Sequence, residues 1–238
     1  MQQGAVRRPM KLSTLPFLDE IEAKISAKHL LQHPFYQAWS RGELTLVILR
    51  DYAAQYYQHV SAFPTYLSAV HAQTDDQAVR KHLLANLMDE EAGSPNHPEL
   101  WMQFAESLGA TRDEVESAEP WTSTRTLIEG FRSACRNHGT AAGVAALYAY
   151  ESQIPAVSEK KIEGLREFYG FQTEEGYRYF TVHIEADREH SAMERALLEQ
   201  LIAPADEAAC SHAVDTVLDG LYGLLTEVCD RHNIAAAC

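Results

Sequence analysis

The chain has 238 residues, of which 34 are acidic and 20 are lysine or arginine, so its formal net charge is −14. An acidic surface without a run of lysine and arginine repels phosphate backbones and anionic lipid headgroups, and we therefore expect neither nucleic acid nor a membrane surface as a partner. Hydrophobic residues make up 46% of the chain and charged residues 23%, which is typical of a soluble globular protein with a sizeable core.

The start of the chain, its lack of a long apolar run and its cysteines indicate a cytoplasmic protein. The start, from Met1 to Lys11, is polar and basic and has no apolar segment of the kind found in signal peptides. No apolar run approaches the roughly 18 residues of a membrane span. The cysteines are widely spaced and form no C-x-x-C motif, so we expect reduced thiols. These cysteines are Cys135, Cys210, Cys229 and Cys238.

Almost every segment repeats apolar residues with the period of a helix, and none alternates as a strand would. The pattern predicts helices over residues 15–28, from Pro34 to a stop at Gly42, and over residues 45–71 with a kink at Pro64. A fourth helix, capped by Asp75 or Asp76, runs to about residue 91. Further helices are expected over residues 97–108, 122–137, 140–151, 158–169, 173–202 and 205–232.

This pattern predicts an all-α protein with one helical domain of seven to nine helices. We place an N-terminal extension at residues 1–14, the helical domain at residues 15–232 and a short tail at residues 233–238.

One predicted helix places two histidines and an aspartate on a single face. His183, Asp187 and His190 lie at offsets of four and seven in TVHIEADREHSAMERALL. At about 100° per residue these offsets return to nearly the same direction around the helix axis. Helix faces rarely bury such groups unless they are paired or bind a metal, so these residues are half of a candidate metal site.

Three further residues offer the other half. Glu151 ends the largely apolar helix AAGVAALYAYESQIP, on the stripe of Leu147 and Tyr148. Glu90 lies near the end of its predicted helix, and His97 follows seven residues later, beyond a Gly-Ser-Pro break. The side chains of Glu90 and His97 meet only if this turn folds back.

Together the six residues supply three carboxylates and three imidazoles. A dinuclear iron or manganese centre in a helical bundle needs these ligands, because carboxylates neutralise and bridge two divalent ions while imidazoles complete each coordination shell. Each residue alone is more often solvated or structural, and only the combination predicts a site.

With these residues the sequence resembles the heme-oxygenase-like dimetal oxidases, and within them the branch of the chlamydial protein associating with death domains (CADD). That branch is similar to protein C of pyrroloquinoline-quinone synthesis and to thiaminase II. The resemblance extends over about residues 15–202 and includes E-x6-H at Glu90 and His97, the glutamate at 151, and H-x3-D-x2-H from His183. It implies a seven-helix heme-oxygenase-like bundle, a homodimer, with two iron ions, or iron and manganese, between the core helices.

The same resemblance implies the O2-dependent formation of p-aminobenzoate for folate synthesis, with O2 and a reductant as small-molecule partners and the enzyme's own tyrosine as the source of the ring. It implies that this tyrosine is Tyr36 in HPFYQAW, that Lys161 in SEKKIEGL donates the amine, and that Tyr150 and Tyr179 support the oxidation. From the residues alone, Tyr36 is equally well an amphipathic core residue with a hydrogen-bonded hydroxyl.

Two of these assignments compete with a neighbouring residue. Glu91 adjoins Glu90 and replaces it as a ligand if the helix register differs by one residue. Lys160 adjoins Lys161, and a lysine near a helix start is usually solvated. A lysine buried beside metals would instead be driven toward the neutral amine that an amination needs.

Three other functions stay open at this point. A dimetal oxidase acting on a diffusible substrate, such as an amino acid or a fatty acid, would turn over repeatedly rather than about once. A metal-free enzyme, either thiaminase-like or like the pyrroloquinoline-quinone synthase, would tolerate the loss of His183 or Asp187. A protein-interaction role, suggested by the name of the chlamydial relative, is compatible with the acidic surface without being specific to it.

Overall fold

The computed structural model describes residues 15–234, so the expected N-terminal extension (residues 1–14) and the end of the expected tail (residues 235–238) lie outside the described residues. Within the described part, the chain forms eleven α-helices and two short 3-10 helices. They are α1 (Leu15–Ala27), η1 (Leu30–Gln32), α2 (Pro34–Ser40), α3 (Leu46–Ala72), α4 (Gln77–Glu91), α5 (His97–Ser107), α6 (Arg112–Glu116), α7 (Thr122–Asn137), α8 (Gly139–Glu151), α9 (Ile154–Glu167), η2 (Glu174–Tyr177), α10 (Arg178–Leu201) and α11 (Glu207–His232).

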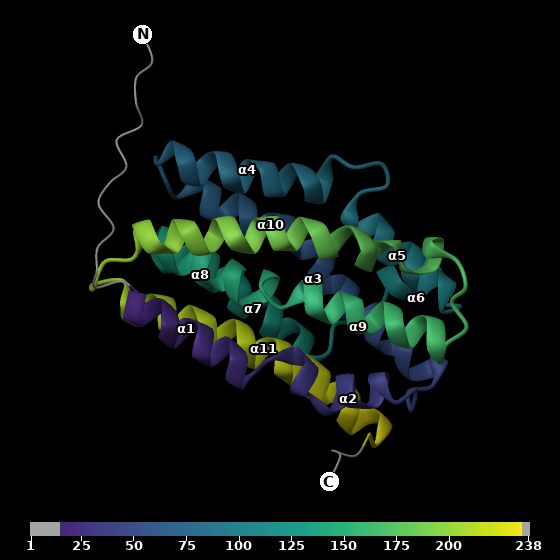
Figure 1. Cartoon of the computed structure of the whole chain (residues 1–238). Coiled ribbons are helices and arrows are strands. Elements are labelled where there is room, and N and C mark those ends of the chain that lie inside the picture. The colour runs from purple at the N-terminus through teal and green to yellow at the C-terminus, as the bar shows by residue number, and fades with distance from the viewer. Residues whose placement is uncertain (1–14, 235–238) are drawn as a thin grey trace.

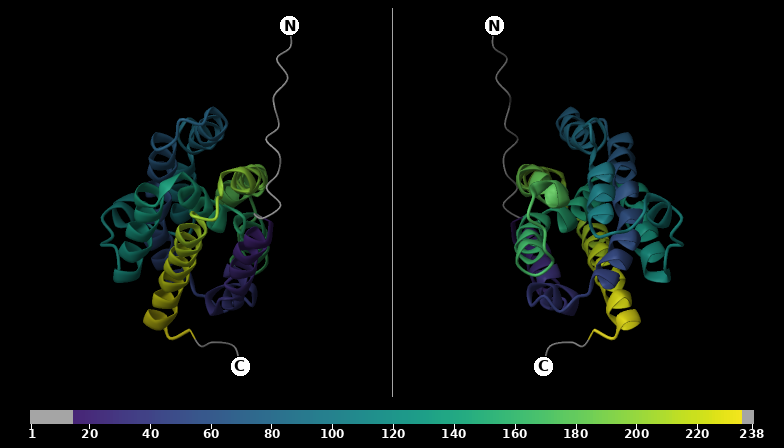
Figure 2. Two further views of the ribbon diagram at one scale, coloured as in Figure 1. Left: turned by 90° about the vertical axis from the view of Figure 1, so that its left-hand side faces the viewer. Right: turned by 90° about the vertical axis from the view of Figure 1, so that its right-hand side faces the viewer.

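The helices form a bundle in which distant segments of the chain lie side by side (Figure 1). α11 packs on α7 and α8, α10 packs on α8 and α9, and α3 packs on α4, α5 and α7. The first helix, α1, lies along the last, α11 (Figure 1). In the two side views of Figure 2, α4 lies at one extreme of the bundle and the end of α11 at the other. α10 contacts α4, α5 and α8, and these four helices carry the six predicted metal ligands.

Short polar side chains cap α3 and two of the ligand-bearing helices, α4 and α5. Thr45 accepts a hydrogen bond from a backbone amide in the first turn of α3, Asp76 does so for α4, and Asn96 does so for α5. Such caps satisfy amides that have no partner inside the helix. α3 continues through Pro64 as one helix. The five residues between α4 and α5 reverse the chain, so the last turn of α4 faces the first turn of α5.

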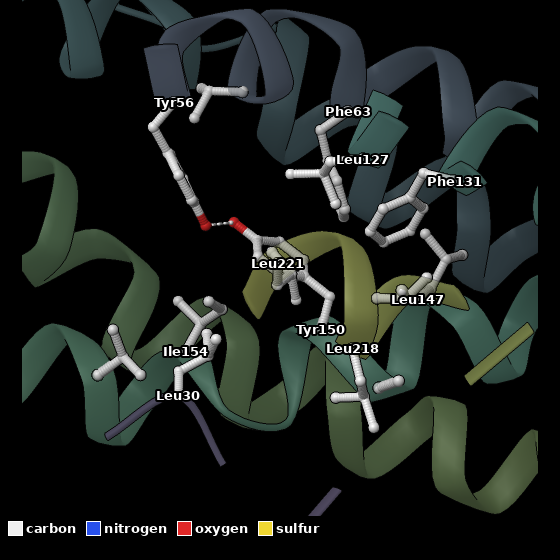
Figure 3. Packing of buried hydrophobic residues seen from close by; sticks show 14 of the residues in the cluster. Leu30, Tyr56, Phe63, Leu127, Phe131, Leu147, Tyr150, Ile154, Leu218 and Leu221 are labelled. Atoms are coloured by element: carbon white, nitrogen blue, oxygen red, sulfur yellow. Dashed lines mark hydrogen bonds between the residues drawn. The ribbon is translucent and has the colours of Figure 1, made fainter. Parts of the chain in front are cut away.

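The centre of the bundle is α8, in which residues 141–151 are all buried. Gly143 allows α8 to approach α3 closely, because a Cβ atom there would lie 2.6 Å from Cγ2 of Val70. Figure 3 shows Tyr150 of α8 among the aromatic and aliphatic core residues, with its hydroxyl joined to that of Tyr56. An apolar helix of this kind carries its last residue, a glutamate, into the interior.

The predicted number of helices is wrong, because the described part contains eleven α-helices rather than seven to nine. α6 was not predicted, since it spans five residues and depends on a capping box between Thr111 and Glu114 rather than on an apolar stripe. α9 begins at Ile154 rather than Ser158, because Pro155 fits the first turn, where its missing N–H costs nothing. The helix expected over residues 173–202 is divided into η2 and α10.

Among residues 15–234, no helix is both long and apolar enough to cross a membrane. Cys135, Cys210 and Cys229 are free and buried, as the sequence predicted for its cysteines, whereas Cys238 lies outside the described residues.

Candidate metal centre

Two groups of three buried side chains lie where α4, α5, α8 and α10 meet. In the first group, one ligand atom each of Glu90, His97 and His183 lies within 4.8 Å of the other two. Oε1 of Glu90 is 3.0 Å from Nδ1 of His97 and 3.9 Å from Nε2 of His183. The turn after α4 therefore folds back and brings Glu90 and His97 together, as the metal-site prediction required.

The second group contains Glu151, Asp187 and His190, again with one ligand atom of each within 4.8 Å of the others. Nδ1 of His190 lies 3.8 Å from Oδ1 of Asp187. Oε2 of Glu151, Oδ2 of Asp187 and Nδ1 of His190 are buried and have no hydrogen-bond partner among the described residues. Buried polar atoms without partners are costly, and a cation bound between them would satisfy all three.

Hydrogen bonds from two of the histidines leave one ring nitrogen of each facing its group. Nδ1 of His183 donates to the carbonyl oxygen of Tyr179 at 2.6 Å, so Nε2 keeps its lone pair. Nε2 of His190 donates to Oδ2 of Asp89 at 3.0 Å, so Nδ1 keeps its lone pair. Contacts of this kind orient metal-binding histidines and set their tautomers.

In both groups, burial and neighbouring groups of the same charge shift the pKa values of the ligand residues. Burial and the neighbouring Asp187 raise the pKa of Glu151 to about 7. Burial and Glu90 raise the pKa of Asp187 well above its usual range, while burial and His97 lower the pKa of His183 well below its own. For His97, burial acts in the same direction and is the largest single effect, but the contact with Glu90 and the charges of Asp187 and Asp89 together outweigh it and raise the pKa. A divalent cation reverses these penalties, so the donor set fits two such ions.

Tyr36 on α2 and Lys161 on α9 lie together in the core, 2% and 3% exposed. Nζ of Lys161 is 5.6 Å from the centre of the Tyr36 ring and donates to the hydroxyl of Tyr52 at 2.7 Å. The hydroxyl oxygens of Tyr36 and Tyr52 are 3.4 Å apart. Burial holds the pKa of Lys161 well below its ordinary value and so favours the neutral amine.

Aromatic rings connect the first ligand group with this lysine. The ring of Tyr179 stacks on the imidazole of His183 with 4.0 Å between centroids. Trp101 contacts Tyr179 at 4.8 Å and stacks on Tyr56 at 4.8 Å, and Tyr56 lies 5.4 Å from Tyr52. The rings therefore form a continuous path from the histidine to the hydroxyl that accepts from the lysine.

Tyr150 joins this path from α8. Its hydroxyl accepts a hydrogen bond from that of Tyr56 at 3.0 Å (Figure 3). Because Tyr150 directly precedes Glu151, the aromatic path also approaches the second ligand group through the backbone of α8.

The structure decides between the two pairs of neighbouring candidates. Glu90 is buried, whereas Glu91 is exposed. Lys161 is buried, whereas Lys160 is exposed and forms an ion pair with Glu163 at 2.5 Å. Glu90 and Lys161 are thus the residues that face the interior.

Sequence reasoning missed four residues of this region. Asn86 is fully buried, and its Nδ2 donates to Oε1 of Glu151 at 2.8 Å. Its position four residues before the buried glutamate of α4 was a usable signal, since this spacing places both on one helix face. Asp89 resembles an ordinary solvated aspartate, and Tyr52 and Tyr56 are typical core residues of α3, so nothing in their spacing distinguished them.

The model of a family described as iron-containing redox enzymes matches residues 50–222. The chain belongs to this family. A protein of Chlamydia muridarum named 4-aminobenzoate synthase is 48% identical, over 92% of this chain and 92% of its own length. A 4-aminobenzoate synthase of Nitrosomonas europaea is 40% identical, over 95% of this chain and 96% of its own. The chain is accordingly an enzyme, an oxidoreductase.

Solved structures confirm the single all-α domain with the heme-oxygenase-like fold. A TenA homologue from Pseudomonas syringae has a TM-score of 0.80 at 16% identity, covering 96% of this chain and 100% of its own. A CADD-like protein from Nostoc punctiforme has a TM-score of 0.76 at 16% identity, covering 93% of this chain and 99% of its own. At these identities the structural similarity shows the fold alone. The family model and the relatives that are 40% and 48% identical show that the chain belongs to the redox family.

Proposed function

We propose that this enzyme forms 4-aminobenzoate in an O2-dependent reaction that takes the ring from Tyr36 and the amine from Lys161. The observation that carries the proposal is the buried pair itself, with Nζ of Lys161 only 5.6 Å from the centre of the Tyr36 ring. Relatives that are 48% and 40% identical over most of the chain are named 4-aminobenzoate synthase, which supports 4-aminobenzoate as the product.

The carbon skeleton of tyrosine matches this product. The ring and Cβ of Tyr36 provide the ring carbons and the carboxyl carbon of 4-aminobenzoate. Cβ is para to the carbon that bears the hydroxyl, so an amine that replaces this hydroxyl, with loss of water, gives the 4-amino pattern. Release of the amine breaks the Cε–Nζ bond of Lys161 and leaves Cε oxidised to an aldehyde, with O2 as the oxidant. Oxidising Cβ to a carboxyl group and cleaving the Cα–Cβ bond both require an oxidant, which agrees with a redox family.

The two ligand groups would hold the metal ions that this oxidation needs. We propose two iron ions, or iron with manganese, one held by Glu90, His97 and His183 and the other by Glu151, Asp187 and His190. Bound there, the metals would supply the electrons that reduce O2. O2 and an external reductant are the small-molecule partners we propose.

Residues around Lys161 position the amine and exclude water. Its Nζ lies over the rings of Trp101 and Phe180, at 5.1 and 4.8 Å from their centres. The hydroxyl of Tyr52 accepts from Nζ and lies 3.4 Å from the hydroxyl of Tyr36, so it holds the amine toward the phenol and can pass a proton between them. A dry aromatic pocket keeps the lysine in its neutral, nucleophilic form.

The proposal is tested by loading the anaerobic protein with ferrous iron and then admitting O2. We expect about two ions and about one 4-aminobenzoate per chain, with the side chain of residue 36 missing in peptide mass spectra. When the lysines carry nitrogen-15 at Nζ, the product should contain the label. Tyr36→Phe should form no product, whereas the control Tyr66→Phe should form the wild-type amount, since the Tyr66 hydroxyl has no partner among the described residues.

Other outcomes distinguish the alternative functions. Repeated turnover with residue 36 intact would indicate a diffusible substrate, and the absence of tight metal binding would favour a metal-free enzyme. Lys161→Ala should abolish the product and leave metal binding intact, while the exposed neighbour Lys160→Ala should retain both. Product formed by Lys161→Ala would exclude this lysine as the amine donor.

A further inference from the structure

Glu194 is a buried carboxylate on α10 that none of the roles above uses. It is 0% exposed and lies one turn beyond His190, on the helix face that also carries Asp187. Neither of its carboxylate oxygens has a hydrogen-bond partner among the described residues. An ionised carboxylate at this depth is costly without a donor, and a bound cation would offset that cost.

The groups next to Glu194 do not provide that cation. The neighbouring ionisable groups that act on it are Glu151, Asp187 and Cys135, and none of these is a cation. Glu151, a member of the second ligand group, likewise has an Oε2 atom with no hydrogen-bond partner in the described part of the chain. Two buried carboxyl groups, one on α8 and one on α10, thus lack a donor in this part of the core.

The charge of the proposed metal centre leaves room for one more carboxylate. The six ligands contain three carboxylates, so with neutral imidazoles they leave two divalent ions with one uncompensated positive charge. A fourth carboxylate makes the buried centre neutral, which lowers its desolvation cost. Helical bundles that hold two iron or manganese ions through carboxylates commonly supply four of them.

We propose that Glu194 is the fourth carboxylate of the metal centre and that its charge holds the cation beside Glu151, Asp187 and His190. This inference rests on the proposed function, because it requires metal ions in the two ligand groups. It extends the motif on α10 by one turn, to H-x3-D-x2-H-x3-E.

The test compares metal binding by the full-length, metal-free wild type and by Glu194→Gln, using equilibrium dialysis against Fe(II) without O2 and against Mn(II). We expect the wild type to bind two ions per chain. The variant should bind one ion with wild-type affinity and the second at least about tenfold more weakly. Glu189→Gln, an exposed glutamate on the same helix, is the matched control and should bind both ions as the wild type does.

Glu194→Asp keeps the charge but shortens the side chain, and its affinity for the second ion should lie between those of the wild type and the glutamine variant. Thermal unfolding of the metal-free proteins separates a metal effect from misfolding, and Glu194→Gln should unfold no earlier than the wild type. Unchanged affinity for the second ion in both Glu194 variants would overturn the inference while leaving the proposed function intact. An equal loss of affinity for both ions would also overturn the inference. A wild type that binds no metal would instead overturn the proposed function.

Discussion

Replacing Lys161 with methionine should stabilise the metal-free protein, by an amount that decreases as the pH rises. Burial holds the pKa of this lysine well below the value of 10.5 that it regains in the unfolded chain. Unfolding therefore takes up a proton at any pH between the two values. Because the unfolded state binds more protons in this window, the free energy of unfolding of the wild type rises with pH, and the lysine destabilises the fold most at the lower end.

The magnitude follows from this linkage and from one hydrogen bond. Each pH unit between the folded-state pKa and 10.5 changes the cost of burying a neutral amine by about 1.4 kcal/mol, so this cost falls by up to about 2 kcal/mol between pH 7.5 and pH 9. The variant loses the 2.7 Å hydrogen bond to Tyr52, worth about 1 kcal/mol. We therefore expect Lys161→Met to be more stable than the wild type at pH 7.5, with an advantage that shrinks by up to about 2 kcal/mol at pH 9.

Urea unfolding of the metal-free proteins at the two pH values, followed by far-ultraviolet circular dichroism, measures this difference. Lys160→Met is the control, because Lys160 is exposed and its ion pair with Glu163 contributes little. It should differ from the wild type by less than about 0.5 kcal/mol at both pH values. A Lys161→Met variant that is less stable than the wild type, or a stability difference that is equal at both pH values, would refute the interpretation of a buried neutral amine.

Three further predictions concern the ligand groups and the core. The folded-state pKa of Glu151, about 7, lies above its ordinary value of 4.5, so the metal-free fold loses stability as the pH rises through this interval. Glu151→Gln should therefore raise thermal stability at pH 8, by up to about 3 kcal/mol, and leave it unchanged at pH 4, whereas a loss at pH 8 would contradict the reasoning. Asp89→Ala removes the hydrogen-bond acceptor of His190 and should lower the affinity for the second ion about tenfold in equilibrium dialysis. An unchanged dissociation constant would argue against a role of this hydrogen bond in metal binding. Phe131 is fully buried and stacks on Tyr66 at 4.6 Å, so Phe131→Ala should cost about 4 kcal/mol in urea unfolding, and a loss below about 1 kcal/mol would show that the cavity collapses.

The parts of the site that lie within one helix could be predicted from the sequence. The helical period alone places His183, Asp187 and His190 on one face of α10, and the structure finds all three buried. Glu151 was recognisable for a related reason, because an apolar helix that ends in a carboxylate carries that carboxylate inward. Glu194, which we propose as a further carboxylate of the centre, continues the face of α10 by the same period.

Choices between adjacent residues could not be made in the same way. Near a helix end, a shift of one residue turns a side chain by about 100°, so Glu91 stayed an alternative to the predicted Glu90, and Lys160 an alternative to the predicted Lys161. The short helix α6 was missed for a related reason, since its capping box holds five residues that show no apolar stripe.

The amino-acid sequence by itself determined the helical class, most helix positions and the six candidate ligands, because these depend on periodicity and on chemistry carried by nearby residues. Only the tertiary structure brought Glu90 to His97 across a reversing turn, and Tyr36 to Lys161 through the packing of α2 on α9. Contacts of this kind depend on how the whole core packs. A period along the chain gives the direction of a side chain around its own helix axis, whereas the neighbour it meets depends on every helix packed beside it.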